Sequence, residues 1–154
     1  MPEKKKISQI LPAENVIFDA DSTSKKRVFE RVGLLFENTR QIARVQVFDS
    51  LFAREKLGST GLGRGVAIPH GRIKGLRDAV AAFVKTETPI PFEAPDGQPV
   101  NLIFVLLVPE RATDLHLQLL GELAQMFSTQ SFREQLQASN DPAALHQVFM
   151  EWKG

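Results

Sequence analysis

The stretch VNLIFVLLV, at residues 100–108, decides the fold class of this chain. Every residue in it except Asn101 is hydrophobic, and several are β-branched or aromatic, a composition typical of a strand buried on both faces. A transmembrane helix needs about 20 apolar residues, so this run is far too short to span a bilayer. We therefore expect residues 100–108 to form the central strand of a sheet.

Further strands and helices are predicted on both sides of this run. We predict strands at residues 15–19, 66–68 and 79–85. Apolar residues at helical spacing predict helices at residues 24–37, around Val47, Phe48, Leu51 and Phe52 with an end near Gly58, at residues 113–127 and 131–138, and after Asp141 and Pro142. Because strands and helices alternate, we expect an α/β fold with a mixed sheet covered by helices.

The length and composition fit one ordinary globular domain. The chain has 154 residues, of which 43% are hydrophobic and 24% charged, and it has no repeat, low-complexity segment or linker that would divide it. We therefore expect a single domain over residues 1–154, in which residues 1–6 are flexible. The basic N-terminus lacks the apolar run of a signal peptide, so we expect a cytoplasmic protein without membrane insertion.

The charge and the cysteine content exclude several classes of function. With 19 Lys and Arg against 18 Asp and Glu, the formal net charge of +1 provides no field that would attract nucleic acid. The absence of cysteine excludes a disulfide framework, a thiolate metal site and a cysteine nucleophile. The histidines at positions 70, 116 and 146 do not have the spacing of metal ligands, so we expect no metal.

A glycine-dense segment, GSTGLGRGVAIPHG at residues 58–71, is the most unusual feature of the sequence. Glycine at this density indicates tight turns or close approach of backbones. The segment lacks the Gly-Lys-Ser/Thr end of a P-loop, and Val66 or Ile68 stands where a dinucleotide-binding loop needs a glycine. We therefore expect no nucleotide cofactor. Ser59 also lacks the surroundings of a hydrolase nucleophile.

His70 lies between Pro69 and Gly71, directly after a predicted strand. The fixed φ of proline and the permissive backbone of glycine can present an exposed imidazole at a sheet edge. An imidazole with an ordinary pKa of about 6.5 is largely neutral at cytoplasmic pH, and one ring nitrogen then has a lone pair that can attack phosphorus. The residues alone also allow a structural histidine in a turn, which is the commoner role of a histidine in such a position.

Two longer segments resemble a known family. The segment REKLGSTGLGRGVAIPHG, at residues 54–71, resembles the active-site segment of the enzyme IIA domains of the bacterial phosphotransferase system, mannitol/fructose class. The segment LIFVLLVPERATDLHLQLLGELAQMF, at residues 102–127, is similar to the second segment of the nitrogen-regulatory branch of that class. The remaining regions match in order and length. The resemblance implies a mixed five-stranded sheet flanked by helices.

The resemblance also implies a set of site residues. His70 corresponds to the phosphorylated histidine, His116 to the second active-site histidine and Arg54 to the active-site arginine. Helical spacing alone would make His116 a core residue, and Arg54 could be an ordinary solvated arginine. Arg64 departs from the small or amide residue expected in its loop, and His146 is expected to face solvent.

Together with the resemblance, these residues predict a phosphotransferase. We expect the tele nitrogen of His70 to accept a phosphoryl group from an HPr-like phosphocarrier (NPr), with His116 and Arg54 stabilising its charge and with no cofactor. The phosphorylation state would then regulate partner proteins. Two alternatives remain open, namely a sugar-transport IIA component that hands phosphate to a separate IIB protein, and a binding module that is never phosphorylated.

Overall fold

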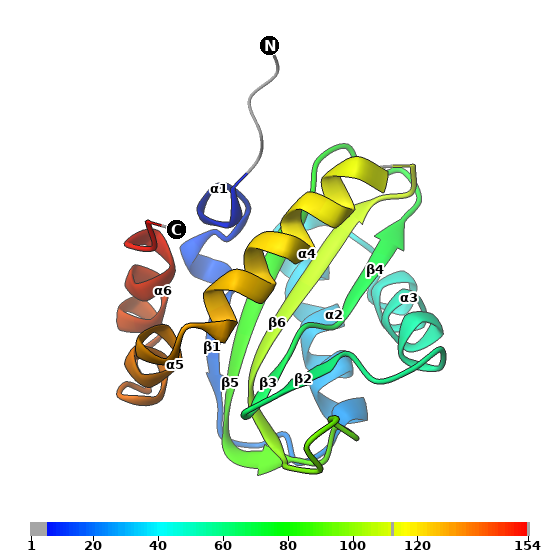
Figure 1. The fold of residues 1–154 in the computed structure, drawn as a ribbon. Coiled ribbons are helices and arrows are strands. Elements are labelled where there is room, and N and C mark those ends of the chain that lie inside the picture. The colour runs from blue at the N-terminus through cyan, green and yellow to red at the C-terminus, as the bar shows by residue number, and fades with distance from the viewer. Residues whose placement is uncertain (1–5, 112, 154) are drawn as a thin grey trace.

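The computed structural model describes residues 6–111 and 113–153. These residues fold around a mixed sheet (Figure 1). The strands are β1 (Val16–Asp19), β2 (Gly61–Gly63), β3 (Val66–Ala67), β4 (His70–Ile73), β5 (Val80–Ile90) and β6 (Val100–Pro109). Their order across the sheet is β1-β5-β6-β3-β2, and β4 also pairs with β6. β5 and β6 pair antiparallel, as do β2 and β3, whereas β1 runs parallel to β5 and both β3 and β4 run parallel to β6.

Six strands occupy five positions in this sheet. β3 pairs with β6 at Leu102 and Ile103, and β4 pairs with the same strand farther along, from Leu106 to Pro109. The two short strands therefore follow one another along one edge of β6. This arrangement confirms the predicted mixed sheet and is compatible with the five-stranded fold that the family resemblance implied.

Helices cover both faces of the sheet, as predicted (Figure 1). One face packs against α1 (Ile7–Ile10), α4 (Thr113–Ser128), α5 (Gln130–Gln137) and α6 (Pro142–Met150), and the other against α2 (Lys25–Arg40) and α3 (Arg44–Glu55). A short 3₁₀ helix, Ala13–Asn15, precedes β1. The result is a layer of sheet between two layers of helix.

The central strand β6 is buried on both faces, which confirms the prediction for residues 100–108. Leu102, Phe104 and Leu106 are fully buried in the core on the α4 side. Ile103 and Leu107 are fully buried in the core on the α2 side. Complete burial of such a side chain contributes roughly 1.5–3 kcal/mol, so this one strand supplies a large part of the hydrophobic stabilisation of both layers.

The predicted helices are present, with differences at some ends. α2 begins after Ser24, whose hydroxyl accepts a hydrogen bond from the N–H of Arg27 (3.1 Å), and it runs beyond the predicted residue 37 to a left-handed C-cap at Gln41. α6 begins at Asp141 and Pro142 as predicted. α3 ends at Glu55, earlier than the predicted end near Gly58, because the backbone there leaves the helix through turns rather than through a left-handed glycine cap.

Two strands and two short helices were not predicted. β2 and β4 are short and lack a clear apolar alternation, so their pairing partners rather than their own sequences determine them. The helices Ile7–Ile10 and Ala13–Asn15 have only four and three residues, too few to show a helical apolar spacing. His70, which was predicted to follow a strand, is itself the first residue of strand β4, so the alternative of a histidine in a turn does not apply.

Residues 1–5 of the N-terminal segment lie outside the described residues. Of the segment 1–6 that we expected to be flexible, only Lys6 lies within the described residues, where it caps α1. Within the described ranges, no helix combines the length and the apolar character that crossing a bilayer would require.

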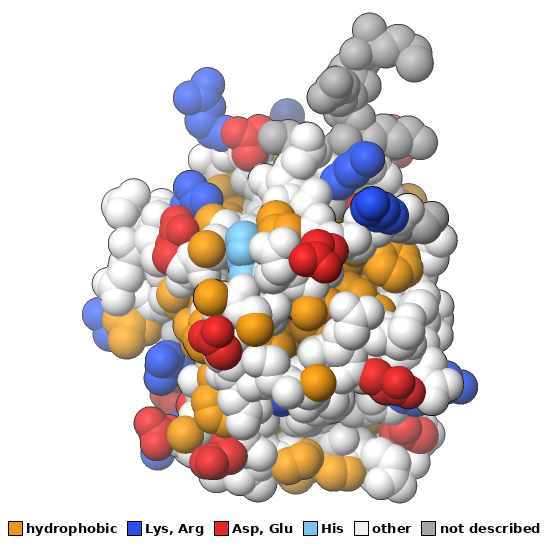
Figure 2. Space-filling view, turned by 90° about the vertical axis from the view of Figure 1, so that its left-hand side faces the viewer, with side chains coloured by type: hydrophobic (Ala, Val, Ile, Leu, Met, Phe, Trp, Pro, Cys, Tyr) orange, Lys and Arg blue, Asp and Glu red, His pale blue; other side chains and the backbone are white. Residues whose placement is uncertain are grey.

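The charges are distributed without a single-sign field on the face that Figure 2 shows. Lys and Arg side chains alternate there with Asp and Glu side chains, and hydrophobic side chains lie between them. This pattern agrees with the formal net charge of +1.

The β2–β3 hairpin gives a test of local backbone strain. Its two-residue loop consists of Arg64 and Gly65, which both have positive φ (58° and 82°), as a type I′ turn requires. Arginine tolerates this conformation poorly, whereas asparagine adopts it readily. Arg64→Asn should therefore raise the free energy of unfolding by about 1 kcal/mol, measured by urea denaturation.

The matched control for this prediction is Arg77→Asn, at another exposed arginine whose backbone φ is not positive. It should change the free energy of unfolding by less than about 0.5 kcal/mol. Equal stabilities of the two variants would contradict the assignment of strain to Arg64.

Candidate functional site

The structure brings together the three residues that the sequence singled out. His70 begins β4, Arg54 lies in the last turn of α3, and His116 lies in the first turn of α4. His70 is in register with Leu106 of β6, whose side chain belongs to the core on the α4 side. The imidazole of His70 therefore lies on that side, where α4 supplies His116.

The ring of His70 has a defined tautomer. Its Nε2 lies 3.2 Å from Nε of Arg54, and its Nδ1 lies 2.9 Å from the carbonyl oxygen of Ile68. Because the guanidinium can only donate, Nε2 accepts a hydrogen bond, and Nδ1 carries the proton that it donates to Ile68. The lone pair of Nε2, the tele nitrogen, is therefore directed at Arg54.

His70 is buried rather than exposed, which corrects the prediction of an exposed imidazole. The residue retains only 7% of its accessible surface. Burial lowers the pKa of His70 below its ordinary value; the positive charge of Arg54 acts in the same direction, whereas the hydrogen bond to Ile68 and the charge of Glu55 act against it. The ring is consequently neutral at neutral pH, and its Nε2 has a lone pair, which accepts the hydrogen bond from Arg54.

His116 packs edge to face against His70. The ring centroids are 4.9 Å apart and the ring planes meet at 84°. His116 is half-buried, and its Nδ1 is buried without a hydrogen-bond partner among the described residues. Burial lowers the pKa of His116, and the positive charges of His70 (when protonated), Arg72 and Arg54 lower it further. Buried polar atoms are rarely left unpaired, so this nitrogen is an unusual feature of the site.

Arg54 is not an ordinary solvated arginine. Its Nε donates to His70, and its Nη1 donates to the carbonyl oxygen of Gly58 at 2.8 Å. One guanidinium thus joins the histidine to the loop that follows α3. A planar fork of this kind is suited to binding the oxygens of a phosphoryl group.

Close packing of α3 against β4 depends on Gly71. A Cβ atom at this position would lie 2.0 Å from Oγ of Ser50 and 3.0 Å from its Cβ. Only glycine therefore lets α3 approach the strand closely enough for Arg54 to reach His70. The density of glycines in residues 58–71 is evident from the sequence, but the need for glycine at position 71 in particular is not.

Glu55 was not predicted, and it fixes the other side of the loop. Its carboxylate is buried and accepts hydrogen bonds from Nζ of Lys25 (2.9 Å) and from the N–H (3.0 Å) and hydroxyl (2.7 Å) of Thr60. Its partner Lys25 is remote in sequence, so no local pattern could have identified this ion pair.

Arg72 was also missed. It lies two residues after His70, so both side chains project from the same face of β4. Its Nη1 donates to the carbonyl oxygen of Glu110 at 3.1 Å, in the segment between β6 and α4. This arginine therefore adds a second positive charge on the side of the strand that faces His116.

The other residues that the sequence analysis discussed lie outside this cluster. The backbone N–H of Arg64 donates to Asp96, and the hydroxyl of Ser59 donates to the carbonyl of Phe92. His146 does not face solvent, which corrects that expectation. It is half-buried, and its Nε2 lies 3.0 Å from the carbonyl oxygen of Leu11, because α6 packs against the segment after α1.

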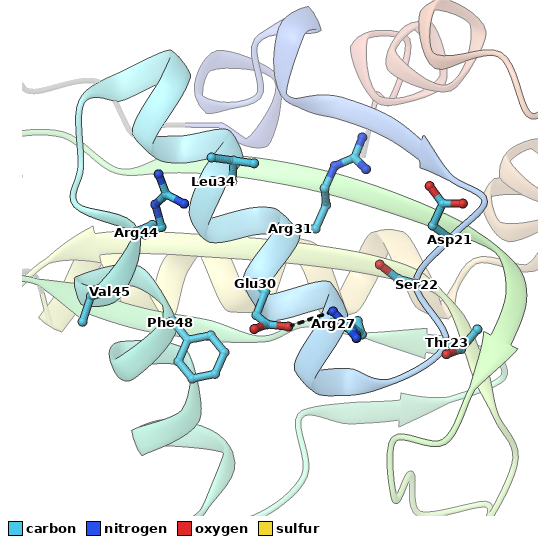
Figure 3. A pocket seen from close by; sticks show the side chains of 10 residues that line it. All are labelled: Asp21, Ser22, Thr23, Arg27, Glu30, Arg31, Leu34, Arg44, Val45 and Phe48. Carbon is cyan, nitrogen blue, oxygen red and sulfur yellow. Dashed lines mark ion pairs between the residues drawn. The ribbon is translucent and has the colours of Figure 1, made fainter.

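The described part of the chain contains no group of three His, Cys, Asp or Glu side chains that could hold a metal ion. A cavity of about 770 Å³ lies along α2 and the start of α3, where Leu34, Val45 and Phe48 meet several arginines (Figure 3). Arg54, His70 and His116 do not line this cavity. The chemistry available at the cluster is that of a neutral imidazole with nearby cationic donors.

Comparison with known proteins gives a consistent result over the whole length. Residues 9–152 match the family described as "Phosphoenolpyruvate-dependent sugar phosphotransferase system, EIIA 2". The chain is 40% identical over 147 residues to a nitrogen regulatory protein of Pseudomonas aeruginosa, covering 95% of this chain and 96% of the relative. It is 38% identical over 150 residues to the Escherichia coli K12 nitrogen regulatory protein, covering 96% and 91% respectively.

Solved structures agree with this result. Nitrogen regulatory protein IIA-Ntr of Neisseria meningitidis is 50% identical, with a TM-score of 0.87, and the match covers 93% of this chain and 98% of that one. IIA mannitol of Escherichia coli, at 19% identity and a TM-score of 0.75, shares the fold over 90% of this chain and 97% of that one.

The burial of the two histidines predicts their titration. Their lowered pKa values should place the midpoints of both rings below 6.5, measured from the Cε1–H resonances by NMR; the urea-unfolded chain, where histidine titrates near 6.5, is the reference. As pH falls through 6.5, the unfolded state gains protons that the native rings do not bind, so the free energy of unfolding should fall. A midpoint for His70 at or above 6.5 would contradict the prediction.

Proposed function

This chain belongs to the EIIA 2 family of the phosphoenolpyruvate-dependent sugar phosphotransferase system, and from that premise we propose that its phosphoryl acceptor is Nε2 of His70. The protein is a phosphotransfer component of the nitrogen-regulatory type, as its full-length relatives are. It exchanges phosphoryl groups with other proteins of the system. We also propose the identity of its phosphoryl donor, the residues of its site and a cytoplasmic location.

The observation that supports the acceptor most directly is the tautomer of His70. Nδ1 donates its proton to Ile68, so the lone pair is on Nε2. In the proposed step, this lone pair attacks phosphorus as the P–N bond to the histidine of an HPr-like carrier breaks. The electron pair of that bond returns to the carrier's nitrogen. Each ring keeps the proton on its other nitrogen, so the transfer needs no net proton movement.

Arg54, His116 and Arg72 are proposed to stabilise the transferred group. A phosphoryl group in transfer spreads negative charge over its equatorial oxygens, and preorganised donors stabilise that charge strongly. Arg54 already contacts the acceptor nitrogen, and the ring of His116, which packs against that of His70, has an unpaired Nδ1. No metal or nucleotide takes part in the proposed step.

The donor proposed here is the HPr-like carrier of the nitrogen branch (NPr). The phosphorylation state of His70 would then change which regulatory proteins the chain binds. A sugar-transport role would require rapid onward transfer to a IIB protein. The nitrogen-regulatory relatives, which match this chain over nearly their whole length, favour regulation instead.

The first test addresses the acceptor. After incubation with phosphoenolpyruvate, enzyme I and an HPr-type carrier, the intact wild-type protein should gain one phosphoryl group that is labile in acid and stable in alkali. His70→Ala should gain none, because it lacks the nucleophile. His146→Ala, at a half-buried histidine outside the cluster, is the control and should be phosphorylated normally. Phosphorylation of His70→Ala at the wild-type rate, or an acid-stable adduct, would overturn the assignment.

The second test addresses His116. If its ring donates to the phosphoryl group, His116→Ala should slow single-turnover transfer from the phosphorylated carrier by at least about tenfold, since one preorganised donor is typically worth 10²–10³ in rate. His116→Gln should retain more transfer, because its amide can still donate. Thermal melting of each variant checks folding. Equal rates in the wild type and both variants would leave His116 with a packing role only.

A further inference from the structure

The strand that carries the acceptor has a free edge, and α3 lies beside it (Figure 1). Among the described strands, β4 pairs only with β6. The carbonyl of Pro69 accepts a hydrogen bond from the N–H of Leu106 in β6 (3.0 Å), and carbonyl directions alternate along a strand. The carbonyls of Arg72 and Lys74 therefore point away from β6, toward α3.

Three side chains of α3, spaced four residues apart, contact this edge. The contacts join Nε2 of Gln46 to the carbonyl of Lys74 (3.2 Å), Oγ of Ser50 to the carbonyl of Arg72 (3.1 Å), and Nε of Arg54 to Nε2 of His70 (3.2 Å). The helix positions rise by four as the strand positions fall by two, so α3 runs antiparallel to β4. We call these three hydrogen bonds the edge ladder.

The edge ladder stays in register because the two repeats nearly match. Four residues of an α-helix rise by about 6.0 Å, and two residues of a strand by about 6.6 Å. Over the whole ladder the mismatch is roughly 1.2 Å, which side-chain rotation can absorb. The middle contact also needs the glycine at position 71, where a Cβ atom would lie 2.0 Å from Oγ of Ser50.

The other contacts of α3 do not fix its position along the strand in the same way. Val47 and Leu51 pack α3 onto the sheet, but apolar attraction is non-directional, whereas hydrogen bonds have limits of distance and angle. Nη1 of Arg54 binds the carbonyl of Gly58, which lies in the turn after α3 and moves with that helix. The contacts of Gln46 and Ser50 are the ones that tie the helix to β4 before Arg54 is reached.

We infer that Ser50 and Gln46 are positioning residues for phosphoryl transfer, because their hydrogen bonds to the free edge of β4 hold the guanidinium of Arg54 at Nε2 of His70. The inference rests on the proposed function. Neither residue touches the acceptor nitrogen. Ser50 precedes Arg54 by about one helical turn, so loss of its hydroxyl lets the end of α3 shift relative to β4 and moves the guanidinium away from the ring.

Titration of the unphosphorylated protein tests where Arg54 lies. The positive charge of Arg54 helps to lower the pKa of His70, so its departure should raise the midpoint of the His70 Cε1–H resonance. Ser50→Ala should raise this midpoint by at least about 0.3 pH unit, and Gln46→Ala/Ser50→Ala by more. A loss of stability alone would not move it, because the resonance is that of folded molecules.

Ser128→Ala is the matched control for the titration. Its hydroxyl also donates to a backbone carbonyl, that of Gln125 (2.8 Å), but at the opposite end of α4 from His116. This variant should leave the His70 midpoint unchanged. A midpoint that is the same in the wild type, Ser50→Ala and Gln46→Ala/Ser50→Ala would overturn the inference.

A double-mutant cycle tests whether Ser50 acts through Arg54. Ser50→Ala should slow single-turnover transfer from the phosphorylated carrier at least about threefold, the order of magnitude that one net hydrogen bond contributes. Added to Arg54→Ala, the same substitution should slow transfer no further, because the group that it positions is already absent. Equal slowing by Ser50→Ala in the presence and absence of Arg54 would overturn the positioning role.

These outcomes are separable from failure of the proposed function. Absence of phosphate on His70 would refute the acceptor assignment, whereas the titration needs no phosphate and still tests the position of Arg54. Normal phosphorylation of His70, with unmoved midpoints and independent effects in the cycle, would refute the role of the edge ladder alone.

Discussion

The structure depends on the burial of β6 on both of its faces. Its hydrophobic side chains alternate between the core beneath α4 and the core beneath α2, so this strand joins the two helical layers through one sheet. Both β3 and β4 pair with it in parallel, one after the other. The position of His70 is thus determined by its register with Leu106, at the point where the second of these short strands begins.

The break between β3 and β4 creates the functional site. Ile68 and Pro69 separate the two strands; the carbonyl of Pro69 accepts from the N–H of Leu106 (3.0 Å), and the carbonyl of Ile68 accepts from the ring of His70. The chain therefore continues along β6 while a backbone oxygen fixes the histidine tautomer. On the other side, the absence of a side chain at Gly71 lets α3 approach and bring Arg54 to the free lone pair.

The electrostatics of the site follow from this packing. A buried imidazole surrounded by arginines is kept neutral, which preserves the nucleophile, and the same arginines are suited to stabilise the dianionic group that the nucleophile would gain. The surrounding charges thus disfavour a proton on Nε2 and favour a phosphoryl group there. The guanidinium of Arg54 contacts both the buried ring of His70 and the carbonyl of the exposed Gly58.

Several features could be read from the sequence by itself. The long apolar run of β6, the helical spacing of α2 and α4, and the caps at Ser24 and Asp141 depend on local patterns, so the α/β class and most elements were predictable. The two motif segments also sufficed to identify the family and to select His70, His116 and Arg54, and the structure brings these three side chains together.

Only the tertiary structure decided the environment of those residues. The burial of His70, the contact of its Nε2 with Arg54 and the pairing of β4 arise from packing against β6, α3 and α4, which are separate elements of the chain. Lys25 and Glu55 form an ion pair although they are 30 positions apart. The buried Lys85 donates from Nζ to three backbone carbonyls at the end of α5, which are 51 to 54 positions away. Local patterns cannot encode such contacts, because packing in three dimensions determines which distant groups meet and how far water is excluded from them.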